Sequence, residues 1–87
     1  MPRPFMGESV DIEMIDLEPG ARPPEAADWI SIEALGSDRY NVAGCVAGEQ
    51  MLVFAGELFE SVDEAALAGV YWARHRGAKT VYVERAI

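Results

Sequence analysis

The sequence predicts an α+β protein: a small antiparallel sheet of four to five strands with one helix packed on one face. Residues 29–55 predict strands, because apolar and polar side chains alternate there in three runs separated by turn residues. Residues 61–77 carry start and stop signals of a helix, and residues 79–85 alternate again. The predicted order is β-β-β-β-α-β, or β-β-β-α-β if residues 10–17 form no strand. The length of 87 residues is that of one domain.

The N-terminal part divides into an arm, a strand and a connection. Residues 1–8 hold two prolines and show no periodicity, which predicts a flexible arm followed by a single domain over residues 9–87. Residues 10–14 alternate apolar and acidic side chains, as a strand with one solvated face does. A helix beginning at Ser9 is the alternative, because apolar residues also recur there at helical spacing. Residues 19–28 contain three prolines, one glycine and three alanines, which predicts an exposed connection.

The middle of the chain predicts a three-stranded antiparallel meander. Residues 29–34 and 40–47 alternate, and the Gly-Ser-Asp turn at 36–38 separates them. Residues 48–49 suit a two-residue hairpin loop of type II′, with glycine in the first position. Residues 51–55 return as a short apolar strand.

The helix is the most clearly marked element. Ser61 and Glu64 form a capping box, in which the Ser61 hydroxyl accepts from the N–H of residue 64 and Glu64 reaches back to the N–H of residue 61. Gly77 suits the left-handed position that follows the last turn. Gly69 lies on a face of small residues, so we expect helix and sheet to approach closely. Trp72 is expected to close one end of the core.

Charge is distributed unevenly. The chain has 15 acidic and 7 basic side chains, for a net charge of −8. Residues 1–28 have a net charge of −5, residues 29–73 one of −6, and residues 74–87 one of +3. Such a field repels phosphate backbones and anionic lipid, so we expect no direct nucleic-acid or membrane binding. It favours a basic protein surface as partner.

No residue pattern indicates catalysis or a cofactor. Phosphate-binding glycine loops and the Gly-x-Ser-x-Gly elbow are absent. Cys45 is the only cysteine and His75 the only histidine, so neither a cysteine cluster nor a histidine-rich metal site can form. We expect Cys45 to be a small buried hydrophobe. The sequence therefore predicts a protein that is not an enzyme and binds neither metal nor cofactor.

One local feature runs against the overall charge. Arg74, Arg76, Lys79 and Arg85 crowd the C-terminal part of the sequence, with Tyr71 and Tyr82 beside them. Such a set could contact nucleic acid weakly through phosphates and stacking. The alternative is that these cations complement the helix C-terminus and protect an edge strand.

The order of a meander, a capped helix and a closing strand over residues 29–86 resembles the small ββ(β)αβ domains. The partial RNase H-like fold of HicB antitoxins is among them. The likeness is one of architecture, and it implies a stand-alone structural or homodimeric domain as an alternative function. In that case an exposed edge strand would pair with its copy.

The leading functional hypothesis is a small acidic protein-binding module without enzymatic activity. It would dock on a basic partner, as small inhibitors and nucleic-acid-mimicking anti-defence (anti-CRISPR-like) proteins of phages do. The absence of a long apolar stretch, including one of the secretory type at the start, predicts a cytoplasmic location. The candidate contact residues are six acids and two aromatic anchors: Asp11, Glu13, Asp16, Glu18, Glu33 and Glu49, with Trp29 and Tyr40.

Overall fold

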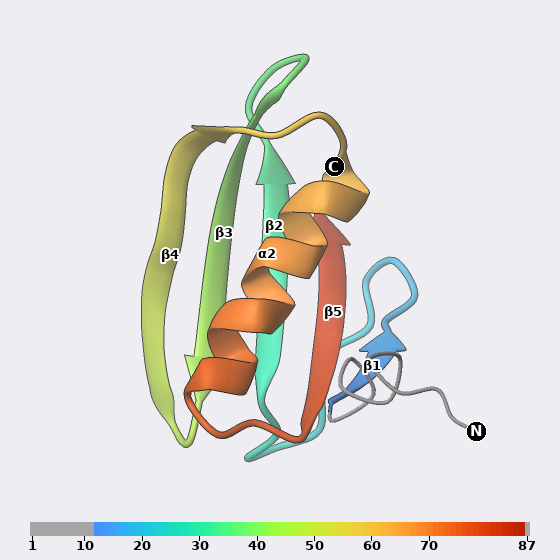
Figure 1. Ribbon diagram of the computed structural model, residues 1–87. Helices are drawn as coiled ribbons and strands as arrows, with labels where there is room; N and C mark the ends of the chain where they lie inside the picture. The colour runs from blue at the N-terminus through green and yellow to red at the C-terminus, as the bar shows by residue number, and fades with distance from the viewer. Residues whose placement is uncertain (1–11, 87) are drawn as a thin grey trace, which may run out of the picture.

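A computed structural model describes residues 12–86, which form a five-stranded sheet with the helix α2 (Val62–His75) lying across one face (Figure 1). The predicted α+β class, a small sheet carrying one helix, is confirmed. The strands follow one another across the sheet in the order β1-β5-β2-β3-β4. Their bounds are β1 (Glu13–Asp16), β2 (Trp29–Ala34), β3 (Arg39–Val46), β4 (Glu49–Leu58) and β5 (Thr80–Ala86).

The meander predicted for the middle of the chain is confirmed as β2, β3 and β4, which pair antiparallel. The hairpin loop between β3 and β4 lies one residue earlier than expected. Ala47 and Gly48 form it, with φ angles of 55° and 83°. Two positive φ angles are those of a type I′ turn, whereas the predicted type II′ turn starting at Gly48 needs a positive φ only in its first position. Asp28 supports the turn, because its Oδ1 accepts from the Ala47 N–H at 3.0 Å.

The sheet is mixed rather than antiparallel throughout. β5 lies between β1 and β2 and runs parallel to both. The helix explains this direction: α2 has 14 residues, about 21 Å, and carries the chain back along the sheet. β5 therefore starts at the end of the sheet where β4 also started, and both strands run the way β2 runs. A helical crossover of this kind is the usual connection between parallel strands.

The first strand extends two residues beyond residues 10–14, where the alternation predicts it. The structure forms β1 over Glu13–Asp16, which confirms a strand rather than a helix for that part of residues 10–17. Residues 10 and 11 and the predicted arm over residues 1–8 lie outside the described residues. The parallel pairing with β5 begins at Glu13 and Thr80.

The core lies between α2 and the sheet, where close approach depends on two glycines. A Cβ atom on Gly69 would lie 2.8 Å from Cδ1 of Ile30, which confirms the predicted close packing of helix on sheet. A Cβ atom on Gly44 in β3 would lie 2.3 Å from Cζ3 of Trp72. The largest fully buried side chains are aliphatic and mostly come from the sheet: Ile30, Ile32, Val42, Val70, Val81 and Val83.

The ends of α2 follow the predicted signals. The Ser61 Oγ accepts from the Glu64 N–H at 3.1 Å, so the N-cap is confirmed. The carboxylate of Glu64 reaches back one residue further than expected, because it accepts from the Glu60 N–H at 2.7 Å. Gly77 takes the left-handed conformation after the last turn, with φ at 95°.

Candidate functional site

The face of the sheet opposite α2 is the candidate functional surface, and we call it the open face. Side chains alternate along a strand, so the neighbours of the buried core residues point to this side. Trp29 in β2 is in register with Cys45 in β3 and with Tyr82 in β5. These three half-buried side chains form a row across the three middle strands of the sheet, at the end where β2 begins, and we call it the central row.

A second row lies next to the first. Ser31 is in register with Glu84 on one side and with Ala43 on the other, and Ala43 is in register with Leu52. Two small side chains therefore occupy the middle of this row. The carboxylate of Glu84 lies at one end of the row, and Leu52, which is 54% exposed, lies at the other.

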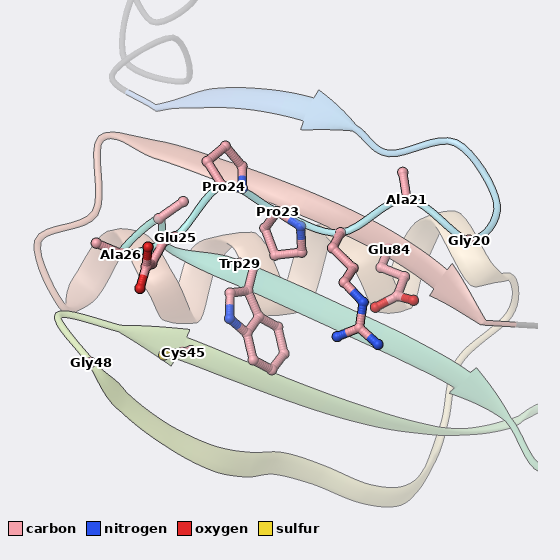
Figure 2. A pocket seen from close by; sticks show the side chains of 12 residues that line it. Gly20, Ala21, Pro23, Pro24, Glu25, Ala26, Trp29, Cys45, Gly48 and Glu84 are labelled. Atoms are coloured by element: carbon pink, nitrogen blue, oxygen red, sulfur yellow. The ribbon is translucent and has the colours of Figure 1, made fainter.

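A hollow of about 710 Å³ lies at one end of the open face, between the sheet and the connection that joins β1 to β2. Trp29 and Cys45 line it from the sheet, together with Glu84 and with residues 20–27 of the connection. Figure 2 shows the Trp29 indole beside Pro23, with Glu25 to one side and Glu84 to the other. The hollow thus combines an aromatic ring, prolines and carboxylates.

Three of the predicted contact residues share the open face. Glu13 and Glu33 are exposed, and Trp29 lies in the central row. Each carboxylate has a neutral donor beside it: Glu13 Oε1 lies 3.5 Å from Thr80 Oγ1, and Glu33 Oε1 lies 3.4 Å from Asn41 Nδ2. Neither contact neutralises the negative charge, so this charge faces solvent.

Two other predicted acids lie on the helix side of the sheet and are paired with arginines. Asp16 accepts from Arg85, and this hydrogen bond is the main reason why the pKa of Arg85 is raised above its usual value. Glu49 Oε1 lies 3.6 Å from Arg76 Nη1. Asp16 and Glu49 therefore do not join the open-face acids. Glu18 is exposed after the end of β1, and Asp11 lies outside the described residues.

Tyr40 is not a surface anchor, contrary to the sequence-based hypothesis. Its side chain is 7% exposed and belongs to the core, where its ring lies 6.2 Å from that of Phe59. The physical reason is its position in β3, where it has the same parity as the buried Val42. The signal was present in the sequence alternation, which placed the two residues on one side of the strand.

The structure separates the predicted basic cluster. Lys79 precedes β5 and Arg85 lies near its end, so the two are about 20 Å apart along the strand. Arg85 also pairs with Asp63 at the start of α2, with 3.2 Å between Nη2 and Oδ1. Arg76 lies at the opposite end of the helix, with its guanidinium 5.3 Å from the centre of the Trp72 ring. The four cations do not form one phosphate-binding patch.

The thiol of Cys45 is half-buried rather than fully buried as expected, because β3 turns it toward the open face. His75 ends α2 on the other side of the sheet, where its Nδ1 lies 2.8 Å from the Tyr71 carbonyl oxygen. The histidine is therefore not placed to act as a base for the thiol. Within residues 12–86, no three His, Cys, Asp or Glu side chains converge as metal ligands would.

Sequence reasoning missed Glu25 and Glu84 as candidate binding residues. The alternation of residues 79–85 places Glu84 on the same side as Tyr82, but only the pairing of β5 with β2 brings it to the hollow that Trp29 lines. Glu25 lies in the irregular connection, for which periodicity carries no information. No signal in the sequence indicates that this connection passes over the sheet.

Comparisons of the chain with protein-family profiles, with curated proteins and with solved structures find no match. The likeness to HicB-type domains therefore rests on the order of elements alone. Among the described residues, no helix has both the length and the apolar character needed to cross a membrane.

Proposed function

We propose that the protein is a non-enzymatic binding module that docks on a basic surface of another protein through the open face. One observation carries this proposal: the half-buried Trp29 shares that face with the exposed carboxylates of Glu13 and Glu33 and with the half-buried Glu84. An aromatic anchor within a polar rim is the usual composition of a protein-binding patch.

The charge of the whole chain supports this choice of partner. A net charge of −8 on 87 residues attracts basic surfaces at long range and accelerates their association. Arg39 is the one arginine on the exposed side of β3, and its Nη1 donates to the Gly56 carbonyl oxygen at 3.0 Å. That contact holds its charge at the β3–β4 margin, away from Trp29. An inhibitor or a nucleic-acid mimic that acts in the cytoplasm would use such a face.

The test begins by isolating the protein that this chain retains from an extract of its source cells or of their prey cells. The rate of association between the two proteins is then measured. We expect the association rate to fall as salt rises from low to physiological concentration, where the screening length is about 8 Å. Glu33→Lys should slow association. Glu57→Lys is the matched control, because Glu57 is also exposed but is in register with Tyr40 and so belongs to the helix side.

Comparing Glu33→Lys with Glu57→Lys shows whether the position of the charge matters or only the net charge of the chain. If Glu33→Lys and Glu57→Lys slow association equally, only the net charge matters and the open face is not the docking surface. If association does not depend on salt, the electrostatic part of the proposal is wrong.

Direct nucleic-acid binding is not expected, because the basic residues are divided between the two ends of β5. Each phosphate contact weakens with salt, and a few contacts on a protein of this charge leave little affinity. We therefore expect no gel shift of DNA or RNA at about 150 mM salt. A shift that Arg74→Glu together with Arg76→Glu abolished would contradict the proposal.

Self-association along β4 is a second candidate, favoured by exposed apolar side chains on this outer strand. β4 has ten residues, and its Leu52 and Leu58 are 54% and 59% exposed. Two register shifts between β3 and β4 interrupt the strand near Val42, and such bulges usually protect edges against pairing. Sedimentation analysis decides between the candidates: we expect a monomer, and a stable dimer that Leu52→Lys dissociates would favour pairing along β4.

A further inference from the structure

We propose that the hollow beside Trp29 receives one arginine side chain of the partner. This inference rests on the proposed function, since it names the group of the basic partner that enters the open face. The hollow has a volume of about 710 Å³ and opens to solvent. It therefore has room for one long side chain together with part of the backbone that presents it.

The first ground for an arginine is the aromatic ring. Trp29 is half-buried and exposes part of its indole to the hollow (Figure 2). A tryptophan ring is the best aromatic partner for a guanidinium, which stacks on its face. The chain already contains one such pair, because the Arg76 guanidinium lies 5.3 Å from the centre of the Trp72 ring on the other side of the sheet.

The second ground is the charge of the walls. Glu25 and Glu84 both line the hollow, and they lie on opposite sides of the indole in Figure 2. A carboxylate can accept two parallel N–H bonds from a guanidinium, whereas the ammonium of lysine offers a single compact charge. An arginine whose guanidinium stacks on Trp29 would thus have a carboxylate on either side of the indole.

The chain supplies one cation of its own to this site. Arg22 is exposed and also lines the hollow, so the three charged lining residues have a net charge of −1. An entering arginine must displace Arg22 or share the carboxylates with it. Arg22 is therefore a resident competitor, and its removal should strengthen binding.

Other guests fit the walls less well. A nucleotide could stack its base on the indole, but its phosphate would meet the carboxylates and a chain of charge −8. A proline-rich segment could pack on Trp29 and Pro23, but it would leave Glu25 and Glu84 without partners. Binding of either of these two ligands is therefore one of the results that the experiment below distinguishes.

The experiment is a titration of the whole chain with blocked Gly-Arg-Gly, followed by ¹H–¹⁵N NMR. We expect a saturable shift of the Trp29 indole N–H and of backbone amides in residues 20–27. The Trp72 indole, which packs on the helix side, should not move. Blocked Gly-citrulline-Gly is the control, because citrulline has the same shape without the charge.

Three conservative variants sharpen the result without disturbing the core. Glu25→Gln and Glu84→Gln should each weaken the affinity for Gly-Arg-Gly about two- to fivefold, as expected for exposed charge pairs. Arg22→Gln should strengthen it about twofold. Glu57→Gln, on the helix side, removes the same charge and should leave the affinity unchanged.

The outcomes separate this inference from the proposed function. Equal binding of blocked Gly-citrulline-Gly, of a proline-rich peptide or of a mononucleotide would overturn the arginine assignment. Shifts confined to amides near Glu13 and Glu33, with Trp29 unmoved, would overturn the hollow as the site but leave the open face as a docking surface. If neither Gly-Arg-Gly nor a longer arginine-rich peptide shifts any open-face amide, both proposals fail.

Discussion

The two faces of the sheet are built from the same strands but differ in how far their side chains are buried. On the helix side, Ile30, Ile32 and Val42 are fully buried against α2. On the open face, their neighbours Trp29, Ser31 and Ala43 are only half-buried. The comparison shows that buried and partly exposed positions alternate residue by residue, because consecutive side chains of a strand point to opposite sides. The proposed docking surface and the core therefore use different side chains of the same strands.

The helix side is closely packed, so we expect it to tolerate few substitutions. The aliphatic side chains of β2, β3 and β5 meet alanines and a glycine of α2, so the backbones lie close together. The open face has no such layer above most of it. Substitutions there should therefore change binding more than they change the free energy of unfolding.

The largest difference between the faces should appear at two consecutive residues of β2. Ile32→Ala should lower the free energy of unfolding by about 2–5 kcal/mol, because it leaves a cavity under α2. Glu33→Ala, on the exposed side, should change it by about 0.5 kcal/mol or less. Urea titration measures both. Ile32→Val, with an expected loss of about 0.5–1.5 kcal/mol, keeps the test informative if Ile32→Ala does not fold.

The contact between Gly44 and Trp72 tests how closely the helix side is packed. Gly44→Ala should cost about 1–3 kcal/mol, because its Cβ atom would lie 2.3 Å from Cζ3 of the Trp72 ring. Gly36→Ala is the control, since a Cβ atom there would have no heavy atom within 4 Å. Equal urea midpoints for the two variants would show that Trp72 moves aside freely.

Removing the N-cap of α2 tests the stability of the helix, which covers one face of the sheet and makes the two faces different. Ser61→Ala should cost about 1 kcal/mol, because the Glu64 N–H loses its acceptor. Ser61→Asp should retain most of the stability, since aspartate caps a helix about as well as serine does. An unchanged urea midpoint for Ser61→Ala would show that this hydrogen bond does not contribute to folding.

The smallest effect concerns solvent access rather than stability. Cys45 faces the open side and should react with a maleimide under native conditions, although more slowly than in denaturant. A thiol introduced by Val42→Cys into a Cys45→Ser background should react only when the chain unfolds, because position 42 is fully buried. Equal native rates for the two thiols would contradict the assignment of the two faces.

Much of the fold could be predicted because its signals are local. The N-cap at Ser61 and the alternation in residues 40–46 depend on neighbours in the chain, and both are confirmed. The hairpin loop was placed one residue too late, because glycine suits the second position of a type I′ turn as well as the first of a type II′ turn. The candidate site could be predicted only in part: Glu13, Trp29 and Glu33 share a face, but Asp16 and Glu49 lie on the other.

The sequence by itself determined which segments form strands and helix and which side of each strand is apolar, because both depend on the period of the side chains. Only the tertiary structure decided that β5 inserts between β1 and β2 in parallel, since pairing partners are chosen by long-range backbone hydrogen bonds that leave no local pattern. That insertion brings Glu84 to the hollow that Trp29 lines, and it brings Arg85 to Asp16 of β1. The hollow beside Trp29 is therefore a product of strand order, which no alternation of residues encodes.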